Sequence, residues 1–261
     1  MNNVRKYGEP PCKIAVVHGG PGAGGEMAPV ARELASEHGV LELLQTATSL
    51  QGQIEELQAV LLSHATLPVT LIGFSWGAWL AFLIAAQQSA IIKKLILIGS
   101  GPFEQAYVEK LQQNRIGRLN EHENIEWNSI IKRLADPAAG DIDALLDRLR
   151  ALASKTDAYD PVEELAQEGL LQSRSEIFRH VWHEAAELRR SGELLKRGAV
   201  IDCPVVAIHG DYDPHPFEGV QIPLAAVLKD FRAILLTQCG HKPWVERMAR
   251  TRFFQLLKDE L

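Results

Sequence analysis

Residues 73–77, with the sequence GFSWG, restrict the fold of this chain more than any other short segment. They join an apolar run at residues 69–72 to a helix-like segment that starts near Trp76. The pattern G-x-S-x-G at such a junction predicts a sharp strand-to-helix turn, because a side chain at either glycine would clash. In that turn the Ser75 hydroxyl stands clear of the backbone, and the N–H of Trp76 faces any oxyanion formed on it.

Length and composition favour one large α/β domain, or such a domain with an inserted subdomain. The chain has 261 residues, of which 46% are hydrophobic, and a formal net charge of -6 without a dense run of Lys or Arg. This charge argues against nucleic acid as the main partner. The three cysteines are widely spaced and form neither a zinc pattern nor a disulfide framework, which is typical of a reducing compartment.

We expect a soluble, cytoplasmic protein without a membrane partner. The first residues carry no apolar signal region, and no run approaches the ~18 apolar residues that a membrane-spanning helix needs. The sequence does not indicate an oligomeric state.

Short apolar runs alternate with helical patterns along the chain, which predicts a doubly wound, mostly parallel sheet with helices on both faces. The expected strands are residues 13–17, 40–44, 69–73, 93–99, 204–208 and 233–236. Helical periodicity covers residues 27–37, 50–64 and 78–86, and a last helix uses Val245, Met248, Phe253, Leu256 and Leu257.

The pattern changes between the fourth and fifth expected strands. Residues 103–201 contain no convincing strand, and charged amphipathic helices take over. Because the sheet pattern then resumes, we expect a core of residues 1–101 and 202–261 with a helical lid, or cap, inserted at 102–201.

A serine hydroxyl needs a base within hydrogen-bond reach, and that base needs a carboxylate to orient it. His241 follows the last expected strand, and Asp211 and Asp213 follow the strand before it. The carboxyl ends of such strands are where a doubly wound sheet gathers its site. The two aspartates lie two residues apart, so only one is expected to point at the histidine. Asp211 directly follows a glycine and is better placed to bond the turn's own backbone.

An oxyanion on the substrate needs two N–H donors. The Trp76 N–H is one, and the glycine-rich loop of residues 18–25 offers Gly20 N–H as the other. A phosphate-binding loop would need Lys and then Ser or Thr after its last glycine, but Glu26 and Met27 stand there. We therefore predict no nucleotide site.

We also predict no metal and no cofactor. His209, His215 and His241 lie near the two aspartates in sequence, but their spacing matches no known ligand pattern. His209 precedes the glycine of its turn and is expected to pack in the core.

Four motifs occur in order over nearly the whole chain: HGGPG at residues 18–22, GFSWG at 73–77, G-x-x-D at 210–213 and G-H-x-P at 240–243. Together they resemble the α/β-hydrolase superfamily, and in particular its proline iminopeptidase-like group. The resemblance implies the α/β-hydrolase fold and a serine hydrolase. It also implies the roles of five residues: Ser75 as nucleophile, His241 as base, Asp213 as the carboxylate that orients it, and Gly20 with Trp76 as oxyanion hole.

The chain departs from that group at two places. Only about a dozen residues precede the HGGPG strand, so the sheet is expected to be shortened by one or two strands at its N-terminal edge. Residues 43–48 replace a segment that normally borders the site. These departures favour a carboxylesterase-like activity on a small-molecule ester or amide.

Two alternatives stay open. One is a prolyl-aminopeptidase-like enzyme, for which Glu104 and Glu184 of the lid are conceivable anchors of the substrate's amine. The other is a non-catalytic protein of the same fold that binds a small ligand under the lid.

Overall fold

The computed structural model describes residues 3–134, 142–166, 170 and 175–261, and within them it forms one seven-stranded sheet in the order β1-β3-β2-β4-β5-β6-β7. Neighbouring strands are parallel except at the edge, where β1 runs antiparallel to β3. The strands are β1 Val4–Tyr7, β2 Cys12–Val17, β3 Gly39–Leu43, β4 Val69–Phe74, β5 Ile92–Ile98, β6 Val205–Gly210 and β7 Phe231–Leu236.

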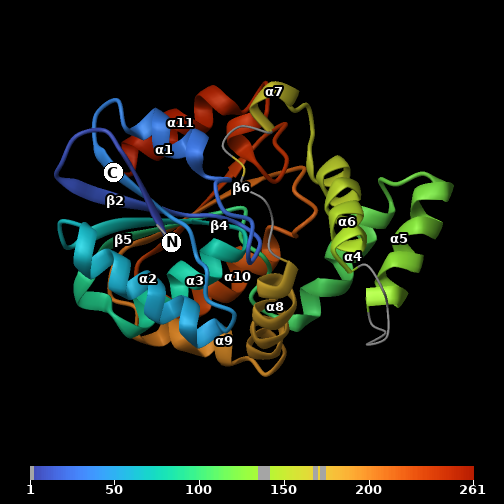
Figure 1. The fold of residues 1–261 in the computed structure, drawn as a ribbon, viewed down its shortest axis with the longest axis horizontal. Helices are drawn as coiled ribbons and strands as arrows, with labels where there is room; N and C mark the ends of the chain where they lie inside the picture. The colour runs from blue at the N-terminus through green and yellow to red at the C-terminus, as the bar shows by residue number, and fades with distance from the viewer. Residues whose placement is uncertain (1–2, 135–141, 167–169, 171–174) are drawn as a thin grey trace.

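Helices cover both faces of the sheet (Figure 1). Helices α1 (Ala28–Leu34) and α11 (Arg250–Asp259) pack on one face, and α2 (Leu50–His64), α3 (Trp76–Gln87) and α10 (Glu218–Val227) on the other. Successive strand residues enter opposite cores: Leu71 packs with α2 and α3, and Ile72 with α1 and α11. Both faces are therefore buried, which is why these strands read as continuous apolar runs. The predicted doubly wound, mostly parallel sheet with helices on both faces is confirmed.

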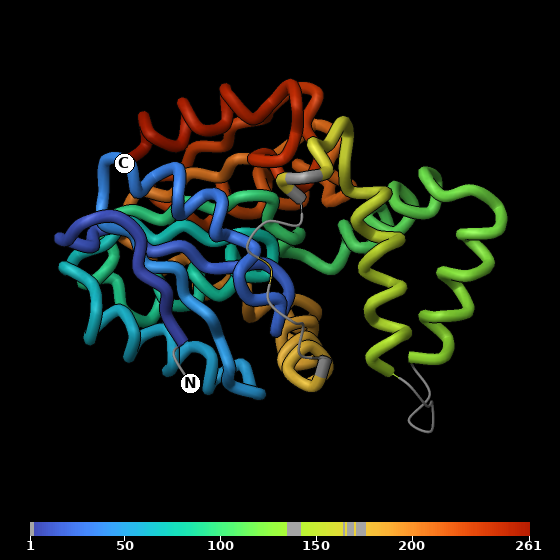
Figure 2. Tube along the Cα trace, turned by 45° about the horizontal axis from the view of Figure 1, so that its top comes forward, coloured from blue at the N-terminus to red at the C-terminus, as the bar shows by residue number. Residues whose placement is uncertain are grey.

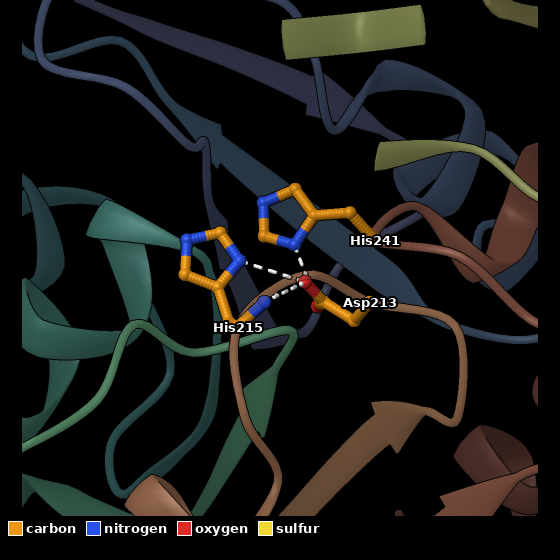
Figure 3. A group of neighbouring side chains, drawn as sticks. All are labelled: Asp213, His215 and His241. Atoms are coloured by element: carbon orange, nitrogen blue, oxygen red, sulfur yellow. Dashed lines mark hydrogen bonds and ion pairs between the residues drawn. The ribbon is translucent and has the colours of Figure 1, made fainter. Parts of the chain in front are cut away.

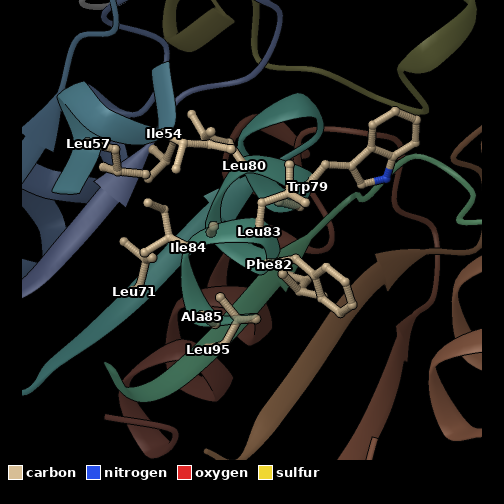
Figure 4. Close-up of a cluster of buried hydrophobic side chains, with 14 of the residues drawn as sticks. Ile54, Leu57, Leu71, Trp79, Leu80, Phe82, Leu83, Ile84, Ala85 and Leu95 are labelled. Atoms are coloured by element: carbon tan, nitrogen blue, oxygen red, sulfur yellow. The ribbon is translucent and has the colours of Figure 1, made fainter. Parts of the chain in front are cut away.

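Helix α3 lies at the centre of the larger core (Figure 4). It has no polar stripe, and its residues from Trp76 to Ala85 are all buried. Trp79 and Phe82 contact the ring of Phe103, at the start of the inserted segment. A helix that is apolar on all sides must be covered on all sides, so α3 fixes the position of the turn that precedes it.

The inserted segment, residues 102–201, carries helices and no strand among its described residues. Helices α5 and α6 lie side by side at one end of the molecule, away from the sheet (Figure 2), and share a small core around Trp127 and Leu145. Helix α8 instead adds Ile177 and Val181 to the core of α3. The α-helices are α4 Val108–Ile116, α5 Glu121–Leu134, α6 Ile142–Asp157, α7 Glu163–Ala166, α8 Ser175–Arg190 and α9 Glu193–Lys196.

Short 3-10 helices complete the described elements: η1 Ser89–Ile91, η2 Gln105–Tyr107, η3 Arg197–Val200 and η4 Pro243–Val245. Among the described helices, none is both long enough and apolar enough to cross a bilayer.

The sequence did not predict strand β1. It has four residues, too few for a periodic pattern, and it is held by pairing with β3 and by its contacts to buried Glu42. That carboxylate accepts a hydrogen bond from the Tyr7 hydroxyl (2.7 Å) and one from Arg5 (3.4 Å). A single strand precedes β2 in the part of the chain described, which is the shortened edge expected from the sequence.

Two helices also differ from expectation. Helix α10 was not predicted, and Pro223 lies inside it. The last helix begins at Arg250 and not near Val245, because Pro243 opens a separate 3-10 turn.

The backbone around residue 73 leaves no room for a side chain. A Cβ atom at Gly73 would lie 2.2 Å from the carbonyl oxygen of Gly77. We expect Gly73→Ala to lower the free energy of unfolding by more than about 3 kcal/mol, measured by urea denaturation. Gly192→Ala is the control, because nothing lies within 4 Å of its Cβ position and only its φ of +77° is unfavourable. That variant should lose about 1 kcal/mol; equal losses in the two variants would contradict the steric explanation.

Candidate active site

Ser75 occupies a strained turn between β4 and α3. Its φ of 52° and ψ of −114° are unusual for a residue with a side chain. The turn is held from both sides: Ser75 N–H donates to the carbonyl of Ile98 on β5 (2.9 Å), and its own carbonyl accepts from Ala78 N–H (3.1 Å). A Cβ at Gly77 would lie 2.4 Å from the carbonyl oxygen of His18, so the start of α3 rests directly on the end of β2.

His241 lies on the loop after β7 and points toward the loop after β6 (Figure 3). Its Nδ1 is 2.7 Å from Oδ2 of Asp213. The ring also packs on Phe74, the residue before Ser75, with 4.7 Å between ring centroids. Gly99 permits this arrangement, because a Cβ there would lie 3.1 Å from His241 Nδ1 and 3.3 Å from Asp213 Oδ2.

Of the two aspartates, Asp213 contacts His241. Asp211 instead accepts a hydrogen bond from the backbone N–H of Cys239 (3.1 Å), in the loop that leads to the histidine. Asp213 is buried, and burial opposes its ionisation. The attraction of His241, His215 and His209 exceeds that penalty and holds the pKa of Asp213 well below its usual range. The carboxylate is therefore ionised at neutral pH.

Ser75, His241 and Gly20 line one cavity of about 630 Å³ between the sheet and the inserted segment. Its walls are mostly apolar, with aromatic rings from Phe74 and Phe178 and small residues from α6. A mostly apolar cavity with a few converging polar groups is typical of a small-molecule site. No Ser75–His241 hydrogen bond is formed among the described contacts, and such bonds are often long without substrate.

Of the two expected oxyanion donors, Trp76 directly follows Ser75, and Gly20 lines the same cavity as Ser75. Trp76 is the first residue of α3, and the first N–H groups of a helix have no partner within it. Gly20 has a φ of +34°, and its carbonyl accepts from Ala23 N–H (2.9 Å), which closes a tight turn beside the cavity.

Two ion pairs in the cavity wall escaped the sequence analysis. Arg115 of α4 donates twice to Asp157 at the end of α6 (2.9 and 2.6 Å), and Lys242 lies 2.6 Å from Glu26. Burial raises the pKa of both carboxyls, but the partner cation more than compensates, so the pKa of Asp157 and of Glu26 is lowered. No motif links partners so far apart in sequence.

Glu246 is a further residue that sequence reasoning missed. It is fully buried, and its carboxylate accepts hydrogen bonds from the backbone N–H groups of Gly240 (3.0 Å), Tyr159 (2.9 Å) and Asp160 (2.7 Å). The backbone N–H of His241 also donates to the carbonyl of Asp157 (2.7 Å). The loop that carries His241 is therefore tied to the inserted segment.

His215 also belongs to the site, although the sequence did not indicate it. Its backbone N–H and its Nδ1 both lie within hydrogen-bond distance of Asp213 Oδ1, at 2.9 and 2.7 Å. Aspartates in turns commonly accept a hydrogen bond from the backbone N–H two residues later. The contact of Asp213 with the His215 N–H could therefore have been predicted from the sequence. The side-chain contact could not.

Asp213, His215 and His241 also form the one group of potential metal ligands found among the described residues. Both ring contacts to the carboxylate have hydrogen-bond lengths, 2.7 Å each. A metal ion would have to replace the protons that these contacts need, so the donor set fits a carboxylate shared by two imidazoles better than an ion site.

The two lid carboxylates considered as amine anchors do not line the cavity. Glu184 accepts a hydrogen bond from the N–H of Leu50 at the start of α2 (2.8 Å), and Glu104 is exposed.

A family model described as the alpha/beta hydrolase family matches residues 14–252. Among solved structures, the chain is similar to an alpha/beta fold family hydrolase from Bacillus anthracis str. Sterne, with a TM-score of 0.74 and 16% identity over 99% of this chain and 94% of that one. It is also similar to VinJ (TM-score 0.71, 17% identity, 98% and 93% covered) and to an N-acyl homoserine lactone degrading enzyme (0.64, 16%, 99% and 96%). No curated protein matches the chain.

Replacing Glu246 tests the link between the His241 loop and the inserted segment. Glu246→Gln keeps the shape of the side chain but places an amide NH2 donor opposite a backbone N–H donor, so the free energy of unfolding should fall by about 1–3 kcal/mol. Urea denaturation measures the loss. Glu193→Gln is the matched control, because Glu193 is half-exposed and pairs with Lys196 on the surface; its stability should not change measurably.

Acid should destabilise the protein partly through His215. Burial lowers the pKa of His215 to about 4 from 6.5, although Asp213 acts in the opposite direction. Below pH 6.5 the His215 side chain is therefore protonated in the unfolded chain, whereas in the folded protein it stays neutral down to about pH 4. Between pH 7 and pH 5 this group costs about 2 kcal/mol of stability. Urea denaturation at both pH values should show a smaller loss in His215→Asn than in wild type; parallel losses would contradict the assignment.

Proposed function

The chain belongs to the alpha/beta hydrolase family, and within it we propose that the protein is a serine hydrolase that cleaves an ester or amide through an acyl-enzyme. One observation carries the proposal: Ser75, on its strained turn, opens into the same cavity as His241, whose other ring nitrogen bonds a buried, ionised Asp213. This is the constellation of a nucleophile, a base and an orienting carboxylate.

The proposed reaction has two halves. His241 Nε2 takes the Ser75 proton as Oγ attacks the carbonyl carbon, and the N–H groups of Gly20 and Trp76 stabilise the oxyanion. His241 then gives that proton to the leaving alcohol or amine as the bond breaks. Water attacks the acyl group in the second half, His241 accepts and returns a proton, and the acid leaves with Ser75 restored. No cofactor takes part in these steps.

His241 can act as a base because its tautomer leaves Nε2 without a proton. An ionised carboxylate only accepts hydrogen bonds, so Nδ1 of His241 carries the proton in its contact with Asp213. Nε2 is then the ring's lone-pair nitrogen and is free to act on Ser75.

Within this class we favour a carboxylesterase-like activity on a small molecule. A peptidase that selects a free amino terminus needs an unpaired carboxylate in the cavity. The acidic residues that line the cavity in the described part of the chain are already engaged: Glu26 by Lys242, Asp157 by Arg115 and Glu246 by backbone N–H groups. The prolyl-aminopeptidase-like reading keeps the support of the HGGPG and GFSWG motifs. A non-catalytic ligand-binding protein is the alternative of another class.

We assign residues 102–201 to a lid over a core of residues 1–101 and 202–261, because α6 and α8 contribute residues to the cavity wall. The substrate is a small molecule, with neither nucleic acid nor a membrane as partner. The three cysteines are free, and two of them are buried, which fits the cytoplasm as location.

A fluorophosphonate probe tests the proposed chemistry directly. Such a probe phosphonylates a serine only when a base and an oxyanion hole activate it. Wild-type protein should be labelled, with the tag on Ser75 by mass spectrometry, and Ser75→Ala should not. Absence of label on folded wild type, or equal label on the variant, would favour the non-catalytic alternative.

The two aspartates provide a matched control for the labelling rate. Asp213→Asn should react about 10³–10⁴-fold more slowly, because the wrong tautomer is held at the histidine. Asp211→Asn changes only a contact to the Cys239 backbone and should lose less than about tenfold by comparison. Equal effects would contradict the assigned role of Asp213.

The leaving group is tested by a pair of substrates. Short-chain nitrophenyl esters should be hydrolysed, whereas a proline arylamide should be hydrolysed at least about 100-fold more slowly in kcat/KM. The physical reason is the engaged state of the cavity carboxylates. Hydrolysis of the amide alone would overturn the preference and restore the prolyl-aminopeptidase-like reading.

A further inference from the structure

Two histidines share the carboxylate of Asp213 (Figure 3), and each contacts a different oxygen. His241 Nδ1 lies 2.7 Å from Oδ2, and His215 Nδ1 lies 2.7 Å from Oδ1, which also accepts the His215 backbone N–H at 2.9 Å. The two imidazole rings stack with centroids 4.5 Å apart and planes 25° from parallel. A single histidine is enough for the orienting role, so the second ring needs its own explanation.

Both rings must donate to the carboxylate. Asp213 is ionised and has only lone pairs to offer, so each Nδ1 within 2.7 Å carries a hydrogen. His215 is buried, and its pKa of about 4 keeps the ring neutral near pH 7. His215 is thus a neutral, fixed hydrogen-bond donor beside the proposed base.

We propose that His215 is a positioning residue for His241: it holds Oδ1 of Asp213, turns Oδ2 toward His241, and draws off part of the carboxylate's charge. The inference rests on the proposed serine hydrolase function.

The surroundings of His215 lock it in this place. The backbone carbonyl of His215 accepts from His209 Nε2 (2.8 Å), and the preceding carbonyl, that of Pro214, accepts from Asn114 of α4 (2.9 Å). His209 is itself fully buried on β6. The donor is therefore preorganised by both the sheet and the inserted segment, as expected for a group that orients another.

The other charges near the two rings largely cancel. Arg115 is paired with Asp157, and Lys242 is paired with Glu26, so each pair adds little net field. His209 lies 3.4 Å from Asp213 Oδ2 but directs its Nε2 to the His215 carbonyl. Burial raises the pKa of the Cys239 thiol, so that group stays neutral. The negative charge of Asp213 therefore acts most strongly on His241, and the Nδ1–H of His215 bonds the same carboxylate.

The expected effect on His241 follows from this sharing. A hydrogen bond to a charged group stabilises it and spreads its charge. Without the donor at Oδ1, the full charge of Asp213 would act on the protonated His241 ring, which would then hold its proton to higher pH.

Two variants of His215 separate the donor from the ring. His215→Phe keeps a stacked aromatic ring and removes the Nδ1–H donor. His215→Asn removes the ring and keeps an N–H donor near the same point. Histidine-ring ¹H–¹⁵N correlation spectra, recorded from pH 4 to 9, follow the protonation of His241 in each protein without any substrate. Exposed His38 serves as internal reference.

We expect the His241 midpoint to rise by about one pH unit in His215→Phe and to stay near the wild-type value in His215→Asn. Coincident midpoints in all three proteins, or equal shifts in both variants, would overturn the proposal. Wild type gives a second test that needs no variant: His215 should show the Nδ1–H tautomer and should not titrate above pH 5. An Nε2–H tautomer would overturn the proposal even if His215→Phe does not fold.

The spectra do not depend on the reactivity of Ser75, so the two proposals can fail separately. Failure of fluorophosphonate labelling with the expected His241 shift would remove the hydrolase function and leave the shared carboxylate. Normal labelling without a shift of the His241 midpoint would support the hydrolase function and overturn the proposed role of His215. In an active enzyme, the acid limb of the kcat/KM profile should move upward with the His241 midpoint in His215→Phe.

Discussion

The site depends on one steric constraint at the junction of β4 and α3. There the backbone packs directly against backbone, with no space for a side chain between them. Gly73 and Gly77 leave no space for a Cβ, and this closeness seats the first turn of α3 directly on the end of β2. Ser75 is thereby fixed at the carboxyl edge of the sheet, with its N–H bonded to β5. The loops after β2, β6 and β7 begin at the same edge of the sheet, so Gly20, Asp213 and His241 lie near the serine there.

The second half of the site depends on the inserted segment as well as on the sheet. The backbone N–H of His241 donates a hydrogen bond to the carbonyl of Asp157. The carboxylate of Glu246 accepts hydrogen bonds from Gly240, the residue before His241, and from Tyr159 and Asp160. Asp157, the last residue of α6, is also part of the cavity wall. This part of the inserted segment therefore contacts both the cavity and the loop that carries His241.

Charge is distributed in the site so that few buried groups lack a partner. Arg115 with Asp157 and Lys242 with Glu26 form closed pairs, and Asp213 is surrounded by histidines. Burial alone would make an ionised Asp213 unfavourable, and its hydrogen-bonded rings reverse that preference. The cavity consequently presents mostly apolar walls, with the polar groups needed for chemistry gathered at Ser75 and His241.

The sequence by itself determined the alternation of strands and helices, the insertion after β5, and the sharp turn at Ser75. These features are local: they follow from hydrophobic period and from the sterics of two glycines. Tertiary structure alone decided that residues 4–7 add an edge strand, and that Glu246 and His215 join the site. Each of these depends on contacts between segments far apart in the chain, for which no local pattern exists. For the two aspartates the sequence already favoured Asp213, because Asp211 directly follows a glycine and is placed to bond the backbone. The packing of the loops after β6 and β7 then brings the Asp213 carboxylate to His241.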